Sequence, residues 1–190
     1  MSWDDVERQG GEGTTTEKTP YTRFEKGATM IRILDNDPHS FWSHWLQQQK
    51  TSITCPGKGC PICNVIAQAK ANKTQVPYSS TQRHAVRVWN YSTERMEILI
   101  QGKKFFSDLL ALHREVGDIT TYDIKVIRNG EGTDTTYMIL PQTPKEFEHG
   151  DEVEEVNLAE VLHAPTNEEI LQLMEGKTWD EINGTGEMSA

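Results

Sequence analysis

The stretch that decides the fold reads Tyr-Asp-Ile-Lys-Val-Ile-Arg-Asn-Gly-Glu-Gly-Thr-Asp-Thr-Thr-Tyr-Met-Ile-Leu, residues 122–140. Residues 122–128 and 135–140 are short runs rich in β-branched and aromatic side chains, which are typical of strands. Between them, Asn129-Gly130-Glu131-Gly132 is a strong turn signal. The stretch therefore predicts a β-hairpin.

Outward from this hairpin, three more runs have the composition of strands: residues 28–34, 84–91 and 95–101. Residues 103–115 carry Phe106, Leu109, Leu110 and His113 at helical spacing, and Gly117 follows as a helix terminator. Five strands with one helix before the last hairpin favour a small OB-type barrel, in which a helix commonly lies between the third and fourth strands. The predicted fold class is mainly β with minor α.

Composition divides the chain into three parts. Residues 1–19 are rich in Gly, Thr and Glu and are predicted to be flexible. Residues 20–145 form the predicted barrel domain, with an insertion near 39–66. Residues 146–190 are predicted to be an acidic tail with short helices, since Thr166 and Glu169 form a capping box and Thr178 begins a similar pattern. Its few apolar residues suggest a segment that docks on partner proteins.

The formal net charge of −10 hides an uneven distribution of charge. Residues 1–19 carry two basic and five acidic groups, residues 20–145 carry sixteen and eleven, and residues 146–190 carry one and thirteen. A middle part with net charge +5 thus lies between ends of −3 and −12. The acidic ends either keep the protein in solution or compete with an anionic ligand for a basic surface.

Several classes of protein are excluded. No run of about 18 apolar residues is present to span a membrane, and Met1–Gly11 lacks the apolar segment of a secretion signal. Three cysteines do not make a disulfide framework, so a cytoplasmic location is expected. The nucleophile-elbow, phosphate-loop and zinc-protease motifs are missing, so we expect a protein that is not an enzyme.

The strongest local motif is Cys55-Pro-Gly-Lys-Gly-Cys60-Pro-Ile-Cys63. The spacing of Cys60 and Cys63 suits tetrahedral Zn²⁺, and three thiolates leave one position for a fourth ligand in a structural site. His39, His44 and His84 are the nearest histidines. We favour His44, because the loop that joins it to Cys55 is short and closes easily. The motif predicts one structural zinc ion per chain.

The strand at 84–91 predicts a surface for single-stranded nucleic acid. With a period of two, Arg87, Trp89 and Tyr91 share one face, and Val86 and Val88 share the other. Bases stack on aromatic rings, and a guanidinium binds phosphate or a base. The alternative is that Trp89 and Tyr91 are covered by the helix or the zinc loop. Further candidates for contact with the nucleic acid are Arg32, Arg83, Tyr122, Lys125, Arg128 and Tyr137.

Taken in order, these motifs resemble the zinc-containing single-stranded-DNA-binding proteins of tailed bacteriophages. The resemblance covers about residues 20–142 and rests on Ile-Arg-Ile-Leu (31–34), the cysteine motif, Arg-Val-Trp-Asn-Tyr (87–91) and Arg-x-Gly-x-Gly before Asp-Thr-Thr-Tyr (128–137). It implies an OB fold with an inserted subdomain that binds zinc through one His and three Cys, matching His44, Cys55, Cys60 and Cys63.

The resemblance also implies a function. Such a protein coats single-stranded DNA with little sequence preference in phage replication, recombination and repair, and its acidic tail recruits the replication and recombination proteins. Self-association on DNA is implied too, although residues 1–19 are acidic where the T-even member of the family has a basic arm. The rival hypotheses are a zinc-stabilised protein-interaction adaptor or transcription regulator and, third, a metal-dependent nuclease, which the scattered carboxylates of the middle part disfavour.

Overall fold

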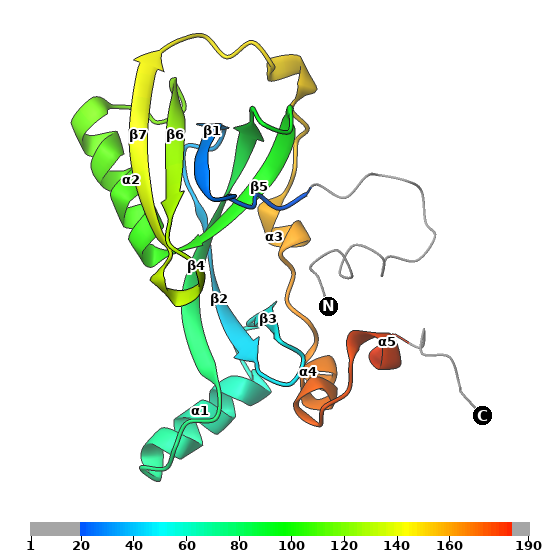
Figure 1. Ribbon diagram of the computed structural model, residues 1–190. Helices are drawn as coiled ribbons and strands as arrows, with labels where there is room; N and C mark the ends of the chain where they lie inside the picture. Colours follow the sequence, from blue (N-terminus) through cyan, green and yellow to red (C-terminus); the bar gives the residue numbers. More distant parts are fainter. Residues whose placement is uncertain (1–19, 184–190) are drawn as a thin grey trace. The chain divides into compact units, whose positions relative to one another are not determined.

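The computed structural model describes residues 20–183 and is mainly β (Figure 1). Across these residues one seven-stranded sheet is formed by β1 (Gly27–Ile33), β2 (His39–Leu46), β3 (Thr51–Thr54), β4 (Ser79–Asn90), β5 (Arg95–Gly102), β6 (Tyr122–Asn129) and β7 (Thr136–Pro144). The helices are α1 (Pro61–Ala71), α2 (Lys103–Val116), α3 (Leu158–Val161), α4 (Asn167–Met174) and α5 (Trp179–Ile182), with short 3₁₀ turns η2 (Gly132–Asp134) and η3 (Gly150–Glu152).

The described residues form two compact units. The first, called here the cysteine unit, comprises His44–Ser79 and residues 164–183. The second, the strand unit, comprises residues 20–43 and Ser80–His163. The residues predicted as one acidic tail are thus divided, with 146–163 in the strand unit and 164–183 in the cysteine unit.

In the strand unit, β1 lies between β4 and β6 and is antiparallel to both. Arg32 on β1 is opposite Trp89 on β4 and Asp123 on β6. Side chains from β1, β4, β5, β6 and α2 meet in one core. Its buried members are Phe24, Ile31, Ile33, Val86, Val88, Leu99, Phe105, Leu109, Tyr122, Ile124 and Val126.

The predicted hairpin and helix are confirmed. β6 and β7 pair antiparallel around a turn where Gly130 has φ +78°, and a Cβ at this residue would overlap the carbonyl of Asp134. α2 ends at Gly117, which has φ +105° and donates its N–H to the carbonyl of His113. Both glycines adopt a backbone conformation that side chains disfavour.

The closed barrel is not confirmed. The sheet order is β3-β2-β4-β1-β6-β7, β5 pairs with β4, and no pairing of β5 with β7 closes the sheet within residues 20–183. Part of the reason lies at Ile98 on β5, whose N–H and carbonyl bond to Pro20 and Thr22. The chain entering the unit therefore occupies that edge of β5.

The cysteine unit has its own core, built from both of its segments. Its buried residues are Leu46, Ile53, Cys60, Ile62, Ile66, Ile170 and Leu173. The strands β2 and β3 and the helix α1 were not among the predicted elements. The two predicted capping boxes are present, at Thr166 with Glu169 and at Thr178 with Glu181, and they begin α4 and α5. Among residues 20–183 no helix has the length and apolar character needed to cross a bilayer.

Candidate functional sites: a metal centre and an aromatic face

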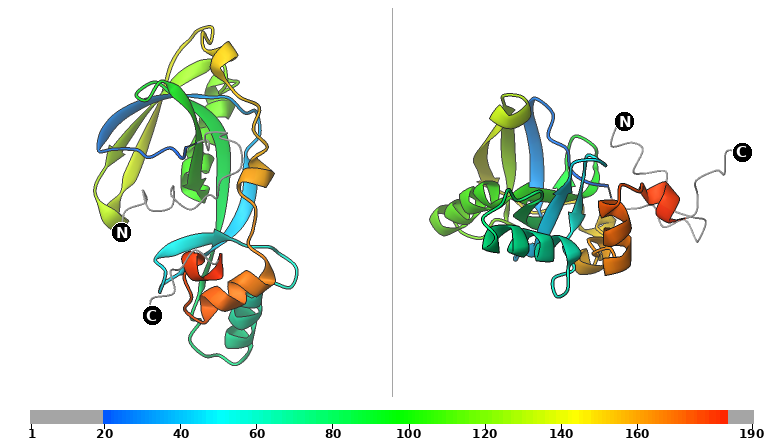
Figure 2. Two further views of the ribbon diagram at one scale, coloured as in Figure 1. Left: turned by 90° about the vertical axis from the view of Figure 1, so that its right-hand side faces the viewer. Right: turned by 90° about the horizontal axis from the view of Figure 1, so that it is seen from below.

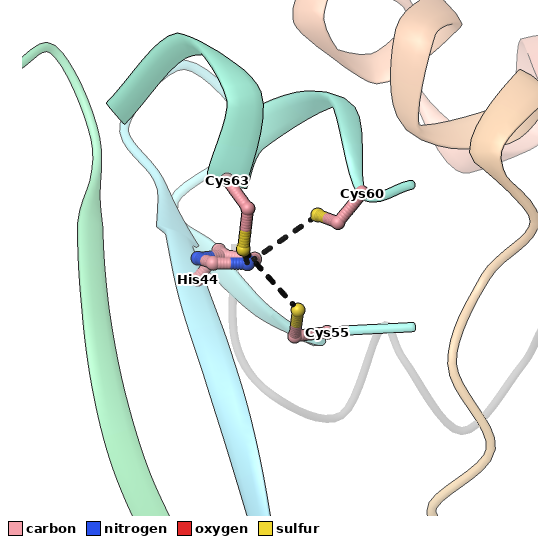
Figure 3. Close-up of side chains that lie close together, drawn as sticks. All are labelled: His44, Cys55, Cys60 and Cys63. Atoms are coloured by element: carbon pink, nitrogen blue, oxygen red, sulfur yellow. Dashed lines mark hydrogen bonds between the residues drawn. The ribbon is translucent and has the colours of Figure 1, made fainter. Parts of the chain in front are cut away.

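The four predicted ligands come together in the cysteine unit. His44 lies on β2, Cys55 follows β3, Cys60 is the N-cap of α1 and Cys63 lies in the first turn of α1 (Figure 3). One ligand atom from each lies within 4.8 Å of every other. Among the three candidate histidines, His44 is thus the one that the structure places with the cysteines.

The distances between ligand atoms fit a tetrahedral ion. The Sγ atoms of Cys55 and Cys63 are 3.6 Å apart, and Nε2 of His44 is 3.5 Å from the Sγ atoms of Cys60 and Cys63. A tetrahedral ion with metal–sulfur bonds of ~2.3 Å and a metal–nitrogen bond of ~2.0 Å requires separations of about 3.8 and 3.5 Å. These three separations thus match edges of one coordination tetrahedron.

The loop between Cys55 and Cys60 depends on its two glycines. Gly57 and Gly59 have φ values of +80° and +81°. The N–H of Gly57 lies 3.3 Å from Sγ of Cys55, and the N–H of Cys60 bonds to the carbonyl of Gly57. An N–H directed at a sulfur stabilises a thiolate, and the tight turn returns the chain to place Cys60 near Cys55.

His44 is held in the form that binds a metal. Its ring is fully buried, and Nδ1 lies 3.2 Å from the carbonyl of Ser79. An Nδ1–H that donates to this carbonyl leaves the Nε2 lone pair directed at the cysteines. Burial lowers the pKa of His44 more than the bond to Ser79 raises it, so the neutral ring is favoured.

The thiols need a cation to ionise together. Burial, and then the neighbouring Cys55 and Cys60, raise the pKa of Cys63 to about 12. Burial is also the main cause of the raised pKa of Cys55. Three thiolates in one place repel each other unless a positive ion compensates them. The cluster can therefore hold a metal ion, and the chemistry of its donors favours one.

The predicted aromatic face exists, but the ring of Trp89 on β4 is not exposed. Val86 and Val88 point into the core, and Arg87, Trp89 and Tyr91 lie on the opposite face. Trp89 is only 2% exposed, because residues 145–155, called here the cover segment, pack over this face. The prediction of an exposed Trp89 is wrong, and the cover comes from neither α2 nor the cysteine loop.

Aromatic rings make the main contact of the cover segment. The ring of His149 stacks on Trp89 with centroids 4.5 Å apart and an angle of 13° between the planes. Phe147 meets Trp89 edge-on at 6.1 Å, and His149 meets Tyr91 edge-on at 6.0 Å. These are the favoured geometries of aromatic pairs.

The cationic side chains of this face are already paired with carboxylate and carbonyl oxygens of the chain. Arg87 forms an ion pair of 2.7 Å with Asp35, lies 3.7 Å from Glu155, and donates to the carbonyl of Glu154. Arg32 is 1% exposed, forms an ion pair of 2.7 Å with Asp123 and lies against the ring of Phe147. Arg32, predicted as a contact to nucleic acid, is thus buried and paired within the protein, as a buried guanidinium must be.

Asp123 organises this part of the face. It accepts hydrogen bonds from Nε of Arg32 (2.7 Å), the hydroxyl of Tyr91 (2.9 Å) and Nζ of Lys145 (2.8 Å). Burial alone raises the pKa of Asp123, but these donors outweigh burial and hold the pKa below its usual range. The pKa of Tyr91 is raised, first by burial and then by Asp123.

The remaining predicted contacts are distributed over the strand unit. Tyr122 is buried in the core, and Tyr137 packs on Phe24 and Phe105, so neither extends the aromatic face. Arg128 donates to the carbonyl of Phe24. Lys125 is half-buried on β6, and Arg83 is half-buried on β4 opposite Gly102.

Three residues of this face were missed by the sequence analysis: Lys145, Phe147 and His149. All three follow or border the start of the stretch that was interpreted as an acidic tail. The signal that could have found them is the pair Phe147 and His149, which are aromatic side chains within an otherwise acidic stretch.

Comparison of the chain with protein-family models, with curated proteins and with solved structures gives no match.

Proposed function

We propose that this protein binds single-stranded DNA with little sequence preference and is not an enzyme. The DNA would take the face formed by Arg87, Trp89 and Tyr91 when the cover segment moves away. The observation that carries the proposal is the parallel stack of His149 on Trp89. A nucleobase makes the same kind of contact with an aromatic ring, for ~1–3 kcal/mol per base.

The cover segment resembles the proposed ligand in a second respect. It brings the carboxylate of Glu155 and the carbonyl of Glu154 to Arg87, next to the rings of Phe147 and His149. Flat rings alternating with anionic oxygens are also what a single strand of DNA presents. We therefore infer that the segment competes with DNA for this face, which agrees with the acidic charge of residues 146–190.

Lys125 supplies a cation that is not part of the Arg32 and Asp123 network. Asp123 and Lys125 are two residues apart on β6, so they share the face on which Asp123 meets Arg32 and Tyr91. The opposite neighbour of Lys125 on β7 is Leu140, which is 38% exposed. This position suits a contact to phosphate beside the stacked bases.

We propose zinc as the metal. One imidazole and three thiolates with tetrahedral spacing are a common structural zinc set, and all four positions are taken by the protein. A closed set of this kind leaves no open position for a reaction, which supports a structural role. The four ligands lie in the cysteine unit, whose small core gains from such a cross-link.

The connection of the strands supports an open OB-type fold. β1 pairs with both β4 and β6, β4 and β5 are consecutive antiparallel strands, and α2 lies between β5 and the hairpin of β6 and β7. Together with the motif order, this supports a role in the replication, recombination and repair of phage DNA, with replication proteins as partners and self-association on DNA.

Titration with oligo(dT) at several salt concentrations tests the proposal. We expect tryptophan fluorescence to be quenched on binding and the affinity to fall steeply as salt increases. Matched titrations with double-stranded DNA and with oligo(U) separate a single-strand preference from general attraction to polyanions. The absence of any response at low salt would falsify the proposal.

The second candidate is a metal-stabilised protein-interaction adaptor. The observation in its favour is the burial of Trp89, since a ring at 2% exposure is also what an ordinary core residue has. Under this hypothesis the cover segment is a permanent part of the core, and removing its rings lowers stability without creating a site for DNA.

A further inference from the structure

The metal ligands and the end of the described chain share one core. Cys60 is buried among apolar residues of both segments of the cysteine unit, and Cys55 and Cys63 pack against the same cluster. α4 contributes Ile170 and Leu173, which are 0% and 1% exposed. The segment that carries α4 is therefore part of the surroundings of the ligands.

The two helices of this core lie side by side. α1, which begins at the ligand Cys60, is in contact with α4 in the views of Figure 2. Ile62 and Ile66 on α1 are 0% and 8% exposed. Because they belong to one cluster with Ile170 and Leu173, loss of α4 would expose apolar surface on α1, which is unfavourable.

The ligand loop also comes close to α4. A Cβ at Gly59 would lie 3.2 Å from Nδ2 of Asn167, the first residue of α4. Gly59 is one residue before Cys60, and its φ of +81° belongs to the turn that positions this ligand. A loop that opens without metal would therefore disturb the beginning of α4.

A polar contact holds the other end of α4. The side-chain amide of Gln49 donates to the carbonyls of Leu173 (2.7 Å) and Lys177 (3.0 Å). Gln49 lies between His44 on β2 and Cys55 after β3. The segment that joins two metal ligands is thus bonded directly to the last turn of α4 and to Lys177 after it.

We propose that metal binding by His44 and the three cysteines and the docking of residues 164–183 on the cysteine unit depend on each other. The metal fixes the ligand loop and α1 in the arrangement that accepts α4, and α4 stabilises the arrangement that binds metal. Coupling of this kind is reciprocal, so each event strengthens the other by the same factor.

The coupling gives the acidic end of the chain two states. In the structure Ile170 and Leu173 lie in the core and Trp179 and Ile182 pack against it, an arrangement that we assign to the metal-bound state. Without metal, these apolar residues would become available to a partner protein. This inference rests on metal binding by the proposed site and does not depend on DNA binding.

The first test measures metal affinity in the full chain by competition with a chromophoric chelator, using zinc as the probe. Ile170→Ala removes a buried contact, and Leu171→Ala is the matched control because Leu171 is 49% exposed on the same helix. We expect Ile170→Ala to weaken zinc affinity at least tenfold and Leu171→Ala to leave it unchanged. Equal affinity of Ile170→Ala and the unmodified chain overturns the coupling.

A milder variant covers the case in which Ile170→Ala does not fold. Gln49→Ala removes the two hydrogen bonds to the end of α4, and Gln47→Ala is its control, since Gln47 is exposed and bonds only to Trp45 among the contacts described. Zinc affinity should fall severalfold in Gln49→Ala and stay constant in Gln47→Ala. An unchanged affinity in both variants speaks against the coupling.

The reciprocal test follows amide hydrogen exchange of residues 167–174 before and after a chelator removes zinc from the unmodified chain. Protection of α4 should be lost while that of β6 in the strand unit remains. Persistent protection of α4 without metal overturns the inference. An unmodified chain that binds no zinc overturns the proposed metal site itself, so the two failures are distinguishable.

Discussion

The imidazole of His149 lies parallel to the indole of Trp89, with ring centroids 4.5 Å apart, on the face of β4 that also carries Arg87 and Tyr91. A side chain from the acidic part of the chain thus occupies the position that the proposed function assigns to a nucleobase. The proposed function predicts that this contact is exchangeable, and that weakening it favours DNA.

The first prediction concerns the double variant Phe147→Ala/His149→Ala. It uncovers Trp89, so affinity for oligo(dT) should rise about threefold to tenfold, since an aromatic pair contributes ~0.5–1.5 kcal/mol. His163→Ala is the control, because His163 is exposed and bonds to Glu160. Fluorescence titration measures the change. A double variant that is less stable but binds DNA no better would identify the cover segment as core only.

The second prediction concerns the metal ligands. His44→Ala removes the nitrogen donor, so elemental analysis should give about one zinc per chain for the unmodified protein and a clear loss for the variant. His84→Ala is the control, because His84 bonds to Ser40 and stacks on Phe106 in the strand unit. Loss of zinc in His84→Ala with retention in His44→Ala would contradict the assignment.

The third prediction concerns Asp123, which pairs with the buried Arg32. Asp123→Asn leaves that guanidinium without its counterion, so the free energy of unfolding at pH 7 should fall by about 3 kcal/mol. Glu131→Gln is the control, since Glu131 and Lys26 form a pair with side chains 82% and 74% exposed. Chemical denaturation measures both. Equal losses in the two variants would argue against a structural role for the buried pair.

Asp123 also predicts a pH dependence. Its pKa is lower in the folded protein than in the unfolded chain. Its contribution to stability is therefore complete above the unfolded pKa of about 3.9 and is lost as pH falls through the folded pKa. Unfolding measured between pH 6 and pH 2 should show a steeper loss for the unmodified protein than for Asp123→Asn, and identical slopes would refute this origin.

The fourth prediction concerns Lys125. If it contacts phosphate, Lys125→Ala should weaken binding to all oligonucleotide sequences about equally and reduce the slope of log K against log salt by about 1. Lys177→Ala is the control, because Lys177 bonds to Gln172 in the cysteine unit. Titrations over a range of salt give the slopes. A slope that is reduced equally in both variants would point to a general charge effect.

The local pattern of the sequence was sufficient for much of this molecule. The alternation that placed Val86 and Val88 on one face of the strand and Trp89 on the other is correct, as are the hairpin at Gly130, the end of α2 at Gly117 and both capping boxes. These features depend on backbone preferences and on neighbours a few residues apart, and a single sequence records them directly.

Contacts between distant segments could not be predicted in this way. The packing of His149 on Trp89 joins residues 60 positions apart, and nothing in the local pattern of 146–156 specifies it. β2 was missed because its residues were interpreted only as part of the insertion that supplies His44. The metal site is the exception, since the spacing of Cys60 and Cys63 already restricts a ligand set to a few candidates.

The two-segment construction of the cysteine unit has a consequence for biosynthesis. His44–Ser79 leave the ribosome long before residues 164–183, yet the core needs Ile170 and Leu173 from the later segment. The intervening Ser80–His163 belong to the strand unit, which has its own core. The strand unit can therefore fold first, and the long-range closure of the cysteine unit is the late step of folding.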